Sequence, residues 1–188
     1  SSWLTEAYAM HDPVRGWNSL VRNTLFAHAE QFPLLWYGVW SGPDSYYGPD
    51  AERPGEADAH LATALTDYPV LNTHSHGSVL RALFAVAGIR GTADGISIAP
   101  MFPTETFSII WPRLSLSSTP TTIEGSLTTV GAGPVTLRVR LPSGLRTGAI
   151  SVTVGGVTVP AQRTGDDASF TFAVAANVST RWTITAGS

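Results

Sequence analysis

The side chains best suited to chemistry lie in a long loop at residues 33–54. Asp44 is surrounded there by aromatic residues: Trp36, Tyr37, Trp40 and Tyr46. Loops of this length without regular structure are uncommon in compact domains and often carry function, and clustered aromatic rings are typical of ligand pockets. We therefore expect a binding site here, with Asp44 as its catalytic carboxylate. The plainer alternatives are that Asp44 caps a Gly-Pro turn and that the Trp rings fill the core.

A second candidate stretch is a run of hydrogen-bonding residues just before a compact apolar helix at 77–87. The run is Asn72, Thr73, His74, Ser75 and His76. The first backbone N–H groups of a helix have no partner within it, so they favour an anion or a polar ligand at this point. In an extended segment His74 and His76 point to opposite sides. One can then line a pocket while the other is a buried, hydrogen-bonded histidine.

Several other classes of chemistry lack support in the sequence. His60 could join the other histidines, but no Cys and no matching carboxylate spacing indicates a metal, and we expect neither metal nor cofactor. No Gly-x-Ser-x-Gly motif indicates a serine hydrolase. The net charge of −3 favours neither nucleic acid nor an anionic membrane as partner, and no run is apolar enough to span a membrane. A hydrophobic content of 43% fits a packed globular protein.

The elements that must position these residues are helices in the first part of the chain. A short helix that carries Trp3, Leu4, Ala7 and Tyr8 is expected at 3–10. Asp12 as N-cap and Pro13 at the first helical position predict a longer helix that ends at Phe32-Pro33. Further helices are expected at 55–66 and 77–87, the last with an apolar face formed by Leu80, Leu83, Phe84 and Ala87, and Gly88 as its stop.

The hydrophobic period changes from 3.6 to 2 after Gly88. Ile96, Ile98 and Met101 predict a strand, and residues 107–116 predict its antiparallel return. The Ser/Thr/Pro stretch at 117–122 is the predicted domain boundary. Beyond it, short alternating strands predict a β-sandwich, with a hairpin at Gly155-Gly156. Solvent-facing Arg138 and Arg140 and a buried Trp182 are also expected there.

A family resemblance can be stated on the run Asp94-Gly-Ile-Ser-Ile-Ala-Pro-Met-Phe-Pro103, which follows a small-residue helix and a polar His/Ser segment. This order resembles the closing part of the (α/α)6-barrel sugar enzymes, the six-hairpin glycoside hydrolases and glycoside phosphorylases. The resemblance covers roughly residues 12–116. It implies an α+β chain: residues 1–116 hold the closing helices of the barrel and its exit hairpin, and residues 117–188 form an antiparallel β-sandwich.

The resemblance also implies a function, the inverting cleavage of a glycosidic bond by water or phosphate. The composition of the loop and the resemblance together place Asp44 and the His74–His76 segment on the attacking side, and the aromatic loop against an oligo- or polysaccharide. The general acid and the remaining barrel helices would come from a preceding polypeptide. The chain does not begin with Met, so we expect a piece of a longer protein, with an extracellular or periplasmic location favoured over a cytoplasmic one.

Two alternatives stay open. A non-catalytic carbohydrate-binding module predicts that the isolated chain binds sugar without turnover. A structural C-terminal module predicts no sugar binding alone and strong association with a preceding chain.

Overall fold

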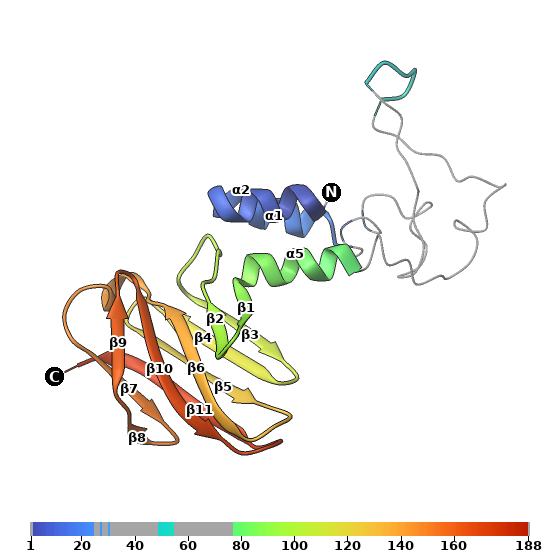
Figure 1. Cartoon of the computed structure of the whole chain (residues 1–188). Helices are drawn as coiled ribbons and strands as arrows, with labels where there is room; N and C mark the ends of the chain where they lie inside the picture. Colours follow the sequence, from blue (N-terminus) through green and yellow to red (C-terminus); the bar gives the residue numbers. More distant parts are fainter. Residues whose placement is uncertain (1, 25–26, 28–29, 31–48, 55–76, 188) are drawn as a thin grey trace. The chain divides into compact units, whose positions relative to one another are not determined.

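The computed structural model describes residues 2–24, 27, 30, 49–54 and 77–187. The chain divides into two compact units, Ser1–Val86 and Ala87–Ser188, and each is described by itself. The described part of the first unit contains the helices α1 (Ser2–His11), α2 (Pro13–Arg22) and α5 (Ser78–Ala87). The last residue of α5, Ala87, is the first residue of the second unit. The second unit is built of β-strands (Figure 1). Among the described residues, no helix is both long and apolar enough to cross a membrane.

Helix α2 begins as its sequence predicts and ends earlier than predicted. The Asp12 carboxylate accepts a hydrogen bond from the backbone N–H of Arg15 at 3.0 Å, so the N-cap is confirmed. The helix stops at Arg22 rather than at Phe32. The side-chain amide of Asn23 donates a hydrogen bond to the Ser19 carbonyl oxygen at 2.7 Å. The Thr24 hydroxyl donates one to the Val21 carbonyl oxygen at 2.8 Å. Such side-chain bonds to backbone carbonyls compete with continuation of the helix.

Helices α1 and α2 pack through small residues. A Cβ atom on Gly16 would lie only 2.8 Å from the Cα atom of Ala9, so glycine is needed for this close approach. Thr5 is fully buried, and its hydroxyl is 2.7 Å from that of Ser19. The short helix expected at 3–10 is present as α1, and its Trp3 and Leu4 side chains are more than half exposed.

Helix α5 is tied to α1 by one arginine. The Arg81 guanidinium lies 2.9 Å from the Glu6 carboxylate and 4.7 Å from the centre of the Trp3 ring. The helix ends at Gly88, whose φ of +66° confirms the predicted stop. Its predicted apolar face is only partly buried, since Leu80 is 57% and Phe84 48% exposed while Ala87 is buried.

The second unit is a two-sheet β domain. One sheet has the strand order β1-β2-β6-β10-β9 and the other β3-β4-β5-β11-β7-β8. All strand pairs are antiparallel except β2 with β6. The strands are β1 (Ile89–Thr92), β2 (Gly95–Ile98), β3 (Phe107–Trp111), β4 (Leu114–Thr119), β5 (Thr122–Thr128), β6 (Gly133–Arg140), β7 (Ile150–Val154), β8 (Val157–Thr158), β9 (Ala161–Thr164), β10 (Asp167–Val174) and β11 (Ser179–Ala186).

The first hairpins of this unit differ from the prediction. Residues 95–98 pair with β1 and β6, not with residues 107–116. Pro112 lies in a tight turn, so that residues 107–116 supply a hairpin of their own, β3 with β4. The stretch at 117–122 contains the end of β4, a two-residue turn and the first residue of β5, all within one sheet. The compact unit thus begins at Ala87, whereas the sequence placed a boundary after residue 116.

Later parts of the sandwich match their sequence patterns. The hairpin between β7 and β8 turns at Gly155 and Gly156, whose φ angles of +57° and +84° suit the predicted two-residue turn. Trp182 is buried, as expected, with its ring centre 5.9 Å from that of Phe170. Alternate residues of both sheets fill the core, among them Leu116, Ile123, Leu137, Val139, Val152, Phe170, Trp182 and Ile184.

Gly125, in the middle of β5, gives a test of this packing. A Cβ atom there would lie 2.3 Å from the Ser115 carbonyl oxygen and 2.8 Å from the Trp182 ring. We expect Gly125→Ala to lower the free energy of unfolding by about 1–3 kcal/mol, the usual cost of overpacking. Urea denaturation followed by Trp fluorescence measures the change. Gly131→Ala is the control, since a Cβ atom there meets nothing within 4 Å. Equal stability of the two variants would contradict this account of the core.

Candidate functional site

All the site residues predicted from the sequence lie outside the residues that the structure describes. They are Asp44 and the aromatic residues Trp36, Tyr37, Trp40 and Tyr46, together with His74, Ser75 and His76. Their roles therefore stay predictions. Within the described residues, no group of three or more His, Cys, Asp or Glu side chains is placed to hold a metal ion.

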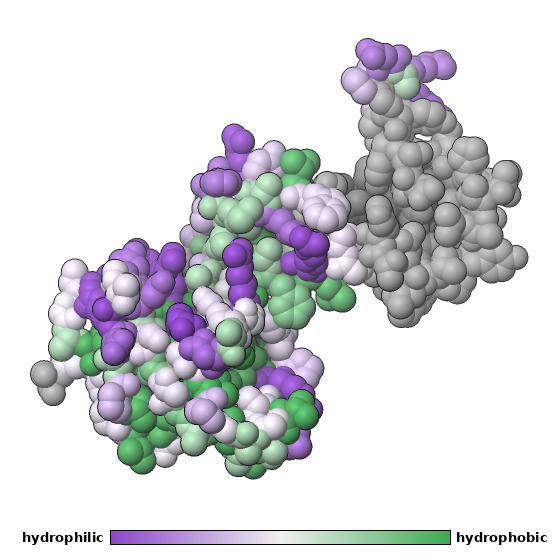
Figure 2. Space-filling model, in the orientation of Figure 1, coloured by the Kyte–Doolittle hydropathy of each residue, from purple (hydrophilic) through white to green (hydrophobic). Residues whose placement is uncertain are grey.

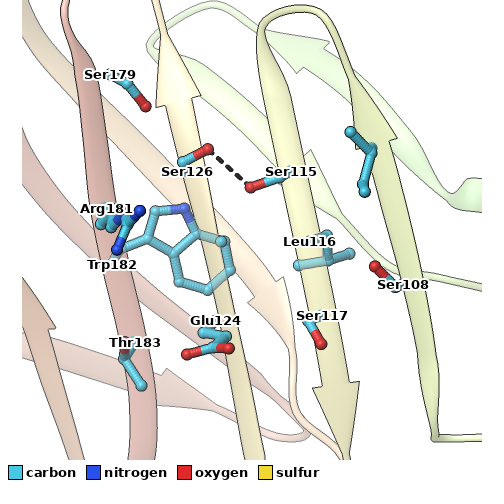
Figure 3. Close-up of a pocket in the computed structure, with 12 residues that line it drawn as sticks. Ser108, Ser115, Leu116, Ser117, Glu124, Ser126, Ser179, Arg181, Trp182 and Thr183 are labelled. Atoms are coloured by element: carbon cyan, nitrogen blue, oxygen red, sulfur yellow. Dashed lines mark hydrogen bonds between the residues drawn. The ribbon is translucent and has the colours of Figure 1, made fainter.

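The described chain does contain a groove, of about 450 Å³, on the six-stranded sheet (Figure 3). Its lining comes from four neighbouring strands, β3, β4, β5 and β11. The polar members are Ser108, Ser115, Ser117, Glu124, Ser126, Ser179, Arg181 and Thr183, and the apolar ones are Ile110, Leu116, Gly125 and Trp182. We call this lining the sheet groove.

Strand register arranges the sheet groove in two rows that cross the sheet. One row pairs Ser108, Ser117, Glu124 and Thr183 across the four strands, and the other pairs Ile110, Ser115, Ser126 and Arg181. Successive side chains of a strand point to opposite faces. Because Ile123, Trp182 and Ile184 are buried in the core, the intervening residues of β5 and β11 face outward.

Opposite charges lie side by side in the sheet groove without pairing. Glu124 and Arg181 occupy diagonal positions on adjacent strands, a relation that puts their α-carbons about 7–8 Å apart. Within the described part of the chain, neither the Glu124 nor the Arg181 side chain makes a hydrogen bond or an ion pair. Their neighbours Ser115 and Ser126 bond to each other instead, with their hydroxyl oxygens 2.7 Å apart. Both charged groups are therefore available to a ligand.

Apolar surface in the sheet groove is limited to its rim. Ile110 on β3 is 84% exposed. Trp182 contributes to the lining but is only 2% exposed, and its ring packs against Gly125 and Phe170. The groove thus offers hydroxyls and two charges, and no exposed aromatic platform.

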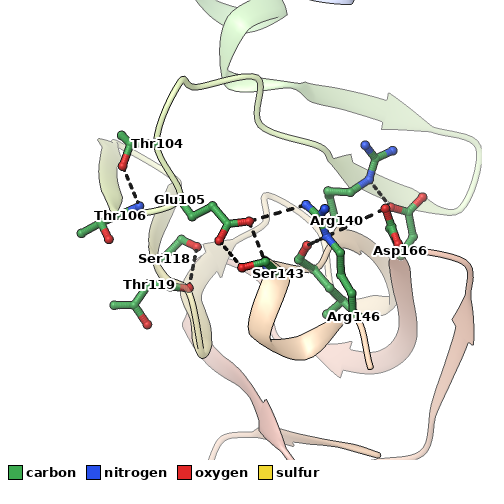
Figure 4. A network of polar contacts seen from close by, with 11 residues as sticks. Thr104, Glu105, Thr106, Ser118, Thr119, Arg140, Ser143, Arg146 and Asp166 are labelled. Atoms are coloured by element: carbon green, nitrogen blue, oxygen red, sulfur yellow. Dashed lines mark hydrogen bonds and ion pairs between the residues drawn. The ribbon is translucent and has the colours of Figure 1, made fainter. Parts of the chain in front are cut away.

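A second polar cluster surrounds Glu105 (Figure 4). The Glu105 carboxylate accepts hydrogen bonds from the backbone N–H of Ser143 at 2.9 Å and from its hydroxyl at 2.6 Å, and Arg146 lies 3.6 Å away. The Ser143 bonds and the Arg146 charge lower the pKa of Glu105. A carboxylic acid that ionises so readily is a poor proton donor near neutral pH. The cluster ties the segment before β3 to the turn after β6.

A third polar cluster joins the β1–β2 turn to β6. The Arg138 guanidinium donates to both oxygens of Asp94, at 3.0 and 2.9 Å, and the Thr92 hydroxyl donates to the same carboxylate at 3.0 Å. The Arg138 and Thr92 hydrogen bonds lower the pKa of Asp94 to about 2. Both partners are exposed, in agreement with the predicted solvent-facing position of Arg138. These contacts brace the fold.

Asp94 makes the stability of the chain depend on pH in a defined direction. Its pKa in the folded chain, about 2, is below its ordinary value of 3.8. The stabilisation from ionised Asp94 is therefore fully present above about pH 4 and is lost as the pH falls toward about 2. We expect the difference in unfolding free energy between the wild type and Asp94→Asn to shrink across this window in urea titrations.

The same prediction can be checked on the carboxyl group itself. An NMR pH titration of Arg138→Met should move the pKa of Asp94 upward, toward 3.8, because the largest cause of its lowering is removed. An Asp94 that titrates at the same pH in this variant and in the wild type would contradict the assigned cause.

Comparisons with known proteins give partial matches to solved structures. No family model and no curated protein sequence matches the chain. A GH127 β-L-arabinofuranosidase from Geobacillus stearothermophilus T6 is 17% identical with a TM-score of 0.37, over 59% of this chain and 18% of that one. An α-L-rhamnosidase from Dictyoglomus thermophilum is 13% identical with a TM-score of 0.35, over 63% of this chain and 15% of that one.

A further GH127 β-arabinofuranosidase is 12% identical with a TM-score of 0.36, over 64% of this chain and 23% of that one. All three are glycoside hydrolases by name, and this chain spans less than a quarter of the length of each. With TM-scores below 0.5, these matches assign no activity to the chain.

The sheet groove was not predicted from the sequence. A signal was present, since Ser115 and Ser117 alternate with buried leucines on β4, and Glu124 and Ser126 flank Gly125 on β5. This alternation predicts a polar outer face for each strand separately. Only the pairing of the strands shows that these faces, with Arg181, make one groove.

Proposed function

We propose that the chain is the C-terminal part of a carbohydrate-active enzyme that cleaves glycosidic bonds. Residues 1–86 would contribute closing helices of an (α/α)6 barrel, and the β-sandwich unit follows from Ala87. The main support is the succession in which α5 stops at Gly88, the Asp94-Gly95 turn joins β1 to β2, and β2 enters a sandwich sheet. This order is that of the family that the sequence resembles.

The surface of the helical unit supports the need for a preceding polypeptide. Figure 2 shows hydrophobic surface over the described helices, beside hydrophilic patches. Several large apolar side chains of α1, α2 and α5 are more than half exposed: Trp3, Leu4, Met10, Val14 and Leu80. Extended apolar surface of this kind is typical of an interface. In the proposed barrel, neighbouring helices supplied by the preceding polypeptide would cover it.

The proposed mechanism is an inverting attack at the anomeric carbon. Inverting enzymes use one carboxylic acid to protonate the leaving oxygen and one carboxylate to activate water on the opposite face of the sugar. Asp44 would be the carboxylate, and the acid would come from the preceding polypeptide. Trp36, Tyr37, Trp40 and Tyr46 would hold the sugar rings. In a phosphorylase, His74, Ser75 and His76 would hold the attacking phosphate.

Asp44→Asn, made in the chain extended by its preceding polypeptide, tests the catalytic part of this proposal. We expect turnover of oligosaccharide substrates to fall by about 100-fold or more, because an amide cannot act as a general base. Reducing-end assays with and without phosphate distinguish hydrolysis from phosphorolysis. Asp50→Asn, in the same loop, is the matched control. Full turnover by an intact Asp44→Asn enzyme would contradict the assignment.

A non-catalytic carbohydrate-binding module is the second candidate function. The sheet groove favours it, since its unpaired Glu124 and Arg181 lie on the sandwich and not on the helices. In that case the isolated chain binds saccharides and the extended protein has no turnover that depends on Asp44.

A further inference from the structure

We propose that the sheet groove is a binding site for a neutral oligosaccharide, formed by other residues than those predicted to cleave the glycosidic bond. The saccharide class rests on the proposed function, whereas the place and the polarity of the ligand rest on the groove itself. The groove lies on the outer face of β3, β4, β5 and β11, and its twelve lining residues include none of the predicted catalytic or aromatic-loop residues.

The chemistry of the sheet groove fits a ligand whose groups both donate and accept hydrogen bonds. The Arg181 guanidinium only donates, and the ionised Glu124 carboxylate only accepts. Serine and threonine hydroxyls between them do both. Sugar hydroxyls, which both donate and accept, can therefore bond to each kind of polar group in the groove. One cation next to one anion also gives no net preference for a charged ligand, since either sign of charge would be attracted by one of the two groups and repelled by the other.

The size of the sheet groove fits a short chain of sugars. Four neighbouring strands with a spacing of about 4.8 Å span roughly 14 Å from β3 to β11. The two rows of polar side chains run along this length and cross β4 and β5. Ile110 at the β3 end, 84% exposed, can contact the apolar face of a terminal sugar ring.

Two features of the sheet groove set the expected strength of binding. Trp182 is buried and so cannot stack on a sugar, and the groove is open to water. Binding therefore depends on hydrogen bonds to the charged groups, and we expect it to be weak. Hydrogen bonds to charged groups are the strongest available here, so removal of Arg181 or Glu124 should have the largest effects.

An NMR titration of the full chain tests this inference. Neutral hexasaccharides of glucose, xylose and arabinose serve as probes, added to the ¹⁵N-labelled protein. At least one of them should shift the amide signals of β4, β5 and β11. Arg181→Ala and Glu124→Gln should each weaken that binding about tenfold or more, as expected for loss of a charge-assisted hydrogen bond.

The matched control for Arg181→Ala is Arg90→Ala, because Arg90 is also an exposed strand arginine but lies on β1 of the other sheet. It should leave binding unchanged. Urea denaturation of each variant verifies that its fold is retained, and Glu124→Gln, which keeps the shape of the side chain, repeats the test if Arg181→Ala is unstable.

Three outcomes would overturn the inference. They are no signal shift with any of the three hexasaccharides, binding unaffected by both groove substitutions, and binding abolished by Trp40→Ala but not by Arg181→Ala. The last would leave the proposed function standing. Conversely, saccharide binding in the sheet groove together with full turnover by the extended Asp44→Asn protein would overturn the proposed catalytic role of Asp44. It would still support the sheet groove as a saccharide-binding site.

Discussion

The contact on which the sandwich most depends is that of the Trp182 ring with Gly125, in the core beside Phe170. Glycine is generally unfavourable inside a strand because it has no side chain to pack and loses much backbone freedom. Here the space that it leaves is filled by the largest side chain of β11. The pairing of β5 with β11 brings these two residues directly opposite each other. The core at this point is thus filled by the Trp182 ring, which occupies the space left by the absent side chain of Gly125.

The same alternation that builds the core also makes the sheet groove. A register in which Trp182 and Ile184 point inward must turn Arg181 and Thr183 outward, and the same holds for Glu124 and Ser126 on β5. A slip of one residue would exchange the two faces. The polar groove is therefore positioned by apolar packing. Two exposed arginines of the neighbouring sheet differ from Arg181, since Arg138 is paired with Asp94 and Arg140 with Asp167.

Local features of the fold could be predicted from the sequence, and long-range pairing could not. Asp12 capped α2, Gly88 ended α5, and Gly155-Gly156 formed a hairpin, because each depends on a few neighbouring residues. The parallel pairing of β2 with β6 joins segments that are distant in the chain, and no local pattern reports it. For the same reason the outer serines of β4 were not connected with Arg181 of β11. The aromatic loop and the His74–His76 segment lie outside the described residues, so their predicted roles stand as predictions.

The central claim is that the outer face of the six-stranded sheet binds sugar. A crystal structure of the full chain with a neutral hexasaccharide tests this claim most directly. Our account predicts sugar density across β4, β5 and β11, with sugar hydroxyls within hydrogen-bonding distance of both Glu124 and Arg181. Sugar bound only elsewhere on the chain, with those two side chains facing solvent, would contradict it.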